Sequence, residues 1–68
     1  MTLMRRLGRN VQRTRHARGW TQAKLAQRVG TSRIYIAQIE GGVAKTCSLP
    51  MLARVAKALR VKPGQLLD

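Results

Sequence analysis

With 68 residues the chain is long enough for one small domain, residues 1–68, and too short for a second hydrophobic core. Its 14 lysines and arginines against 2 acids give a formal net charge of +12, which favours a polyanionic partner. Nucleic acid is the first candidate for that partner, and an anionic membrane surface is the second. The single cysteine excludes an intrachain disulfide, and the apolar runs fall far short of the ~20 residues of a membrane span, so we expect a cytoplasmic protein.

Glycine, proline and hydroxyl residues divide the chain into short segments whose apolar residues recur at helical spacing. We expect five helices, at about residues 3–18, 22–29, 33–40, 49–59 and 63–67. The expected N-caps are Thr21, Ser32 and Ser48. Trp20 follows the glycine that stops the first helix and is expected to enter the core, and Leu49 begins the apolar face of the fourth helix. No segment alternates with period two, so the expected fold class is all-α.

Residues 21–40, TQAKLAQRVGTSRIYIAQIE, have the pattern of two short helices that cross closely around a tight turn. Such a crossing needs a small residue, supplied by Ala26, and a turn residue that tolerates positive φ, supplied by Gly30. It also needs apolar residues behind each helix, which are Leu25, Val29, Ile36 and Ile39. These residues occur at the spacing of a helix-turn-helix motif.

The segment resembles the Xre family, the phage repressor and Cro type of helix-turn-helix domain. The run LGRNVQRTRHARGWTQ resembles the first helix of that family and its entry into the second, and SLPMLARVAKALRVKPGQLL resembles the fourth and fifth helices. The resemblance implies a five-helix lambda-repressor-like bundle that binds double-stranded DNA as a sequence-specific transcriptional regulator, and not an enzyme. Thr14 and Thr31 depart from the aliphatic residues usual in the family, and the glycine-rich loop 41–47 is longer than in compact members.

The outer face of the third helix carries the expected base-contacting residues. Docking of this helix buries Ile36 and Ile39, which leaves Ile34, Tyr35 and Gln38 on the opposite face, with Arg33 in the first turn. The resemblance implies that these residues, Arg33, Ile34, Tyr35 and Gln38, contact bases. We expect Ile34 to contact thymine methyl groups and Gln38 to read a base edge, plausibly adenine, whereas Arg33 either reads guanine or holds a phosphate. The alternative for the exposed isoleucine and tyrosine is a self-association patch.

Gln22 opens the second helix, where free N–H groups and the positive helix end favour a phosphate. The resemblance implies that this glutamine clamps the DNA backbone, and the alternative is a plain exposed side chain. The other expected backbone contacts are Ser32, Lys24, Arg28, Lys45 and Arg13. Glu40, the only acid inside the chain, needs a cationic partner, which the resemblance implies is Arg15, with Arg18 as runner-up. His16 and Cys47 are too few for a zinc site, so no metal or cofactor is expected.

The expected assembly is a homodimer on a short, roughly palindromic operator, with half-sites one helical turn apart, ~34 Å. Some of the apolar surface of Val61, Leu66 and Leu67 is expected to pack on the first and fourth helices. What is left over, with the Val43–Cys47 loop beside it, is the expected contact between copies. A single small domain leaves control to its own concentration, to proteolysis or to a protein partner such as a toxin, which fits phage regulators, restriction-modification controllers and antitoxins alike. The alternatives are a protein-interaction module on the same fold and a membrane-active peptide, which the several short helices disfavour.

Overall fold

The computed structural model describes residues 2–44 and 47–68, which form five helices joined by short turns. The helices are α1 (Leu3–Ala17), α2 (Gln22–Val29), α3 (Arg33–Glu40), α4 (Leu49–Leu59) and α5 (Pro63–Leu67). The described residues contain no strand, so the all-α prediction is confirmed, and only the end of the first helix differs, by one residue.

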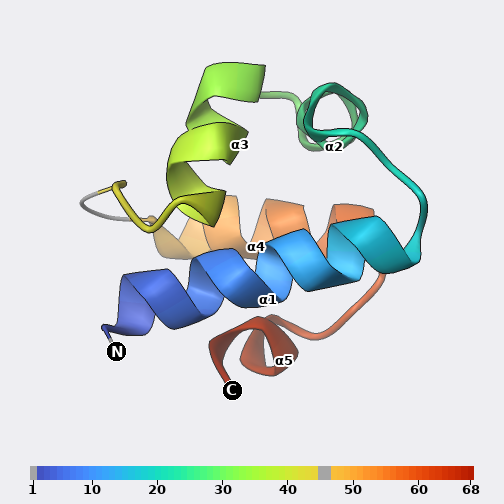
Figure 1. The fold of residues 1–68 in the computed structure, drawn as a ribbon. Coiled ribbons are helices and arrows are strands. Elements are labelled where there is room, and N and C mark those ends of the chain that lie inside the picture. The colour runs from blue at the N-terminus through green and yellow to red at the C-terminus, as the bar shows by residue number, and fades with distance from the viewer. Residues whose placement is uncertain (1, 45–46) are drawn as a thin grey trace.

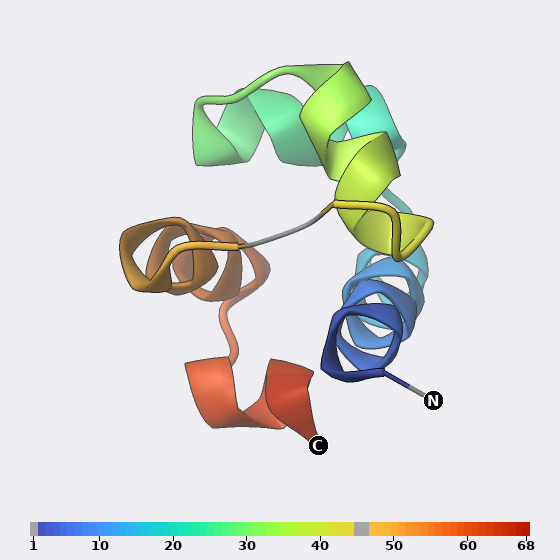
Figure 2. The same cartoon turned by 90° about the vertical axis from the view of Figure 1, so that its left-hand side faces the viewer.

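The helices stack in two pairs with a fifth helix beneath (Figure 1). Figure 2 shows α3 above α1 on one side and α2 above α4 on the other, and α5 lies under them. Contacts join α1 to α3, α2 to α4, and α5 to both α1 and α4. Two helix–helix junctions, α1 with α3 and α2 with α4, therefore set how the helix-turn-helix segment sits on the rest of the domain.

Hydroxyl side chains fix where four of the helices begin. Each accepts the backbone N–H of the residue three positions on, at 3.0–3.2 Å, and these caps are Thr2, Thr21, Ser32 and Ser48. This contact satisfies one of the N–H groups that have no partner inside a helix. The caps predicted from sequence are therefore present, and they explain why these bounds could be found in advance.

One core joins all five helices. Its buried side chains are Leu7, Val11, Leu25, Ala26, Val29, Ile36, Ile39, Leu52, Val55, Ala56, Leu59 and Leu66. One prediction about the core was wrong. Leu49 is 78 % exposed, because it begins α4 in a stretch, residues 48–50, that is exposed throughout. Trp20 packs against the core as expected and is half-buried, with the guanidinium groups of Arg18 and Arg28 over its ring.

None of the helices in the described part of the chain is long and apolar enough to cross a membrane.

Candidate nucleic-acid interface

The turn between α2 and α3 holds the two helices in a fixed relation. Gly30 ends α2 with φ 85°, a left-handed conformation that glycine adopts without a Cβ clash. The backbone N–H groups of Gly30 and Thr31 both donate to the carbonyl of Ala26, at 2.8 and 3.0 Å. The chain is then in position for Ser32 to cap α3, so the turn sets both the start and the direction of that helix.

The two faces of α3 differ sharply in burial. Ile36 and Ile39 are 0 % and 1 % exposed, as predicted. On the other face Ile34 is 63 % exposed, and Arg33 and Gln38 are exposed with it. An aliphatic side chain exposed between two polar ones gives this face both apolar and hydrogen-bonding groups for contact with a partner.

Tyr35 departs from the other three residues expected to contact bases. It is half-buried and packs against the core near Cys47. Burial raises the pKa of the Tyr35 hydroxyl, and the neighbouring thiol raises it further. Burial also raises the pKa of Cys47, so both groups stay protonated and neutral. The tyrosine therefore links α3 to the segment that leads into α4, and presents less of itself to a ligand than Ile34 does.

A nearly buried ion pair connects α1 to the end of α3. Nε and Nη2 of Arg15 donate to the two carboxylate oxygens of Glu40 at 2.7 and 2.9 Å, and the two side chains are 7 % and 3 % exposed. The remaining Nη1 of Arg15 donates to the carbonyl of Trp20 at 2.7 Å. Hydrogen bonding to Glu40 raises the pKa of Arg15, although burial opposes it. The pair expected from the resemblance is present, and the runner-up Arg18 instead donates to the carbonyl of Leu59.

Gln22 joins the same network. Its Nε2 donates to a carboxylate oxygen of Glu40 at 3.1 Å, so the first residue of α2 is tied to the last residue of α3. One N–H of the side-chain amide is used in this bond, which leaves the second available to an acceptor outside the protein. The network holds the side chain at a definite place beside the end of α3.

The remaining residues expected to contact the DNA backbone do not all lie near α3. Ser32 is at the start of α3 and Lys24 is in the first turn of α2. Arg13 is bonded to Asn10, whose amide donates to the carbonyl of Leu66, so this arginine belongs to the junction of α1 with α5 and not to the α3 side. Arg28 points toward α4, over the ring of Trp20. Lys45 lies outside the described residues.

A family model for the helix-turn-helix domain matches residues 6–68. The chain belongs to the helix-turn-helix domain family. Together with the structural neighbours described below, this match confirms the Xre type expected from the sequence, a class of DNA-binding transcriptional regulators. A comparison with curated proteins found no match.

Three solved structures illustrate how closely this helix-turn-helix domain follows the fold of known regulators. A hypothetical transcription factor, NHTF from Neisseria, is 31 % identical over 98 % of this chain and 76 % of its own, with a TM-score of 0.93. The restriction-modification controller C.AhdI from Aeromonas hydrophila is 30 % identical over 93 % of this chain and 94 % of its own, with a TM-score of 0.87. SinR, a master regulator for biofilm formation solved in complex with DNA, is 27 % identical over 91 % and 98 %, with a TM-score of 0.86.

One residue that positions the helix-turn-helix segment was missed from the sequence. Gly8 lies where α1 passes under the end of α3, and a Cβ there would overlap the carbonyl oxygen of Ile39 and lie 2.9 Å from that of Glu40. The available signal was a glycine inside a helix, where it costs about 1 kcal/mol relative to alanine and so needs a packing reason. The two backbones come this close only because residue 8 has no side chain.

Proposed function

We propose that this helix-turn-helix domain is a sequence-specific transcriptional regulator that binds a short, roughly palindromic operator as a homodimer, with α3 in the major groove. The observation that carries the proposal is the outer face of α3, where Arg33, Ile34 and Gln38 are exposed together. An eight-residue helix is about 12 Å long, comparable to the width of the major groove. Arg33 and Gln38 supply donors for base edges, and Ile34 supplies an apolar surface for thymine methyl groups.

Backbone contacts at both ends of α3 would hold it in register. Ser32 is at its first turn, and Gln22 is beside its last residue through the bond to Glu40. We propose that Gln22, Ser32 and Lys24 contact phosphates on the two sides of the groove. Lys45 stays a further candidate, and the positions of Arg13 and Arg28 make them the weakest of the set.

Leu66 is buried within the domain, and Val61 and Leu67 are half-buried and pack against its core, so the C-terminal end leaves little apolar surface for a second copy. The dimer contact that we propose therefore lies elsewhere than the one expected from sequence. The large apolar side chains left exposed at the end where α1 and α4 begin are Leu3, Val43 and Leu49. Figure 2 looks onto this end, where the loop after α3 and the start of α4 face the viewer. We propose that pairing there places the two α3 helices one helical turn of DNA apart, ~34 Å.

The test of recognition is selection of bound duplexes from a random pool by wild type and three variants. We expect Arg33→Ala and Gln38→Ala to change the preferred bases at one position each, with a loss of about 1–3 kcal/mol on the wild-type site. Gln22→Ala should weaken all duplexes by a similar factor, because phosphate contacts carry no sequence information. A change of preference in Gln22→Ala alone would contradict the proposed docking.

Salt dependence separates this function from a protein-interaction module. If each protomer neutralises four to six phosphates, log K should fall against log salt with a slope on the order of −7 to −11 for the dimer. A slope near zero, with no preferred duplex, would indicate the interaction module.

The test of the dimer is Leu49→Asp. An acid in the first turn of a helix is favourable, so α4 should keep its stability while the exposed apolar surface is lost. We expect the variant to sediment as a monomer and to bind the selected operator at least tenfold more weakly, while its affinity for one half-site is unchanged. A wild type that gains nothing from a second half-site would contradict the dimer.

A further inference from the structure

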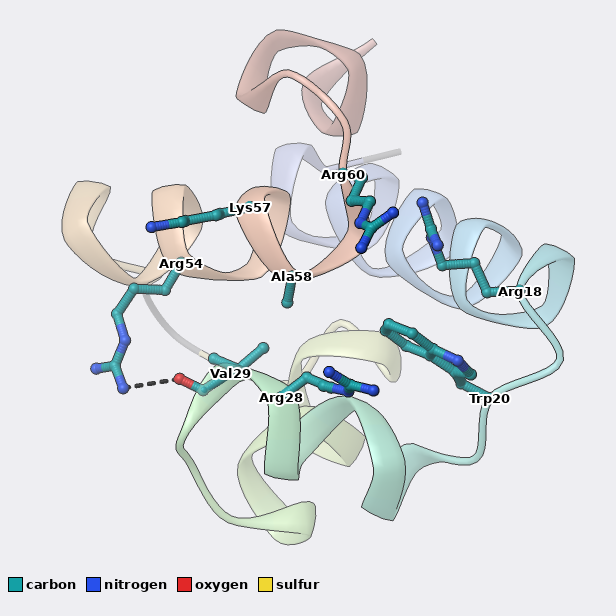
Figure 3. Close-up of a pocket in the computed structure, with 8 residues that line it drawn as sticks. All are labelled: Arg18, Trp20, Arg28, Val29, Arg54, Lys57, Ala58 and Arg60. Atoms are coloured by element: carbon teal, nitrogen blue, oxygen red, sulfur yellow. Dashed lines mark hydrogen bonds between the residues drawn. The ribbon is translucent and has the colours of Figure 1, made fainter.

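A basic hollow lies on the side of the domain away from α3. It has a volume of about 550 Å³ and is bounded by α2, α4 and the end of α1 (Figure 3). Trp20 forms one wall, and five cationic side chains surround it: Arg18, Arg28, Arg54, Lys57 and Arg60. We call this the α2–α4 hollow. No residue of α3 lines it, so it is separate from the face proposed to read DNA.

The positive charge of the hollow is not balanced by the protein. None of the residues that line it is an acid. The only acid inside the chain, Glu40, is already paired with Arg15 in the junction of α1 with α3. Five of the 14 lysines and arginines therefore surround one cavity and repel one another. A bound anion would relieve that repulsion.

Three of the arginines are held in place without a carboxylate. Nη2 of Arg54 donates to the carbonyl of Val29 at 2.7 Å, and Nε of Arg18 donates to the carbonyl of Leu59 at 2.9 Å (Figure 3 shows the first bond). The guanidinium carbons of Arg18 and Arg28 lie 5.4 and 5.6 Å from the centroid of the Trp20 ring. A guanidinium has five N–H donors, so each of these groups is anchored and still has donors for a ligand.

The fourth arginine occupies a backbone position that normally favours glycine. Arg60 ends α4 with φ 58°, and it is the one residue other than glycine with positive φ among those the structure describes. Glycine or asparagine would adopt this conformation with less strain. An arginine here places a charge at the rim of the hollow, although its Cβ strains the backbone in this conformation.

We propose that the α2–α4 hollow binds a compact polyphosphate, such as the phosphate chain of a nucleoside triphosphate or inorganic tripolyphosphate. The volume falls in the range of small-molecule sites, about 300–1,000 Å³. Planar guanidinium groups match phosphoryl oxygens through paired N–H donors, and several adjacent cations match a ligand whose charges follow one another along a short chain. A small anion fits this concave site, whereas a duplex needs the outer face of α3.

The experiment uses the full chain at physiological ionic strength, with sodium tripolyphosphate and ATP as probes, followed by calorimetry and by fluorescence. Trp20 is the only tryptophan in the chain and lines the hollow, so its emission reports occupancy of this site. We expect both probes to bind with a stoichiometry of one per chain and to change the emission. Equal affinities assign recognition to the phosphates alone, and tighter binding of ATP adds a contact with the base.

A matched pair of variants separates the hollow from general attraction of anions to a basic protein. Lys57→Gln/Arg60→Asn removes two charges from the hollow, and Arg6→Gln/Arg9→Gln removes two exposed charges elsewhere, on α1. We expect the first variant to bind tripolyphosphate at least tenfold more weakly and the second to change less than threefold. Asparagine tolerates positive φ, so the melting temperature of the first variant should not fall. Equal losses in the two variants, or no binding by the wild type, would overturn the proposal.

Discussion

The two helix–helix junctions of this domain use arginine in opposite ways. Where α1 meets α3, Arg15 is buried, bonded to both oxygens of Glu40 and to a backbone carbonyl, and the helices approach until only Gly8 fits between them. Where α2 meets α4, the helices leave a hollow. Its arginines donate to backbone carbonyls or lie over the ring of Trp20, and no acid lines it.

The difference indicates what each junction does. A charge that is fully paired and buried fixes geometry, and at the junction of α1 with α3 that geometry is the angle at which α3 sits. A charge that is positioned but not neutralised retains its capacity to bind. We infer that the first junction is structural and the second is available to a ligand. The predictions that follow compare the two directly.

The largest effect is expected from Glu40→Gln. The change leaves the charge of Arg15 buried without an opposite charge, and breaking such a pair costs about 3 kcal/mol. We expect urea denaturation to show a loss of this size, and DNA affinity to fall as well because α3 loses its tie to α1 and to Gln22.

The matched change in the other junction is Arg54→Gln, which removes a bond to the carbonyl of Val29 on an exposed side chain. Here we expect a loss of only about 1 kcal/mol. Equal losses in the two variants would show that the junctions do not differ in the way we infer.

A loss smaller than that of Glu40→Gln is expected from Gly8→Ala. Alanine favours the helix by about 1 kcal/mol, but its Cβ would overlap the carbonyl oxygen of Ile39, so α3 must shift, and overpacking of this kind costs about 1–3 kcal/mol. The balance of these two effects is a net loss of up to about 2 kcal/mol, which denaturant unfolding would measure. The control is Gly64→Ala in α5, where a Cβ meets nothing within 4 Å and stability should be kept or slightly raised. A stabilised Gly8→Ala would mean that α1 and α3 separate without cost.

The elements of this fold could be predicted because their signals are local. A hydroxyl residue, an apolar residue at every third or fourth position and a glycine stop all act within one helix, which is why the bounds of α2, α3 and α5 agree with the structure. The exposed face of α3 followed from the same periodicity once Ile36 and Ile39 were assigned to the core. The pairing of Arg15 with Glu40 spans 25 residues and came from the family resemblance, not from spacing.

The features that escaped prediction depend on how helices meet. Whether Trp20 is covered is decided by the side chains of Arg18 and Arg28 from two different segments. The position of Arg13 is decided by Asn10, which reaches the carbonyls at the end of α5. The burial of Leu66 likewise needs α1 as a partner. Periodicity within one helix cannot report such contacts, because it says which face is inward and not what lies opposite.

The smallest effect is expected from Arg60→Gly, and its sign is the informative part. A residue with a Cβ pays roughly 1–2 kcal/mol for the left-handed conformation, and glycine removes that strain. Glycine also gains conformational freedom in the unfolded chain, which lowers the free energy of unfolding by about 0.5–1 kcal/mol. We expect a net gain of about 0.5 kcal/mol in thermal or urea unfolding, increased slightly because the repulsion among the five cations of the hollow is reduced. A variant that is more stable than wild type yet binds tripolyphosphate less well would show that Arg60 serves the hollow at the expense of the fold. A loss of stability would instead mean that the arginine contributes contacts that outweigh the strain of its backbone, and the two junctions would then be less different than their charges suggest.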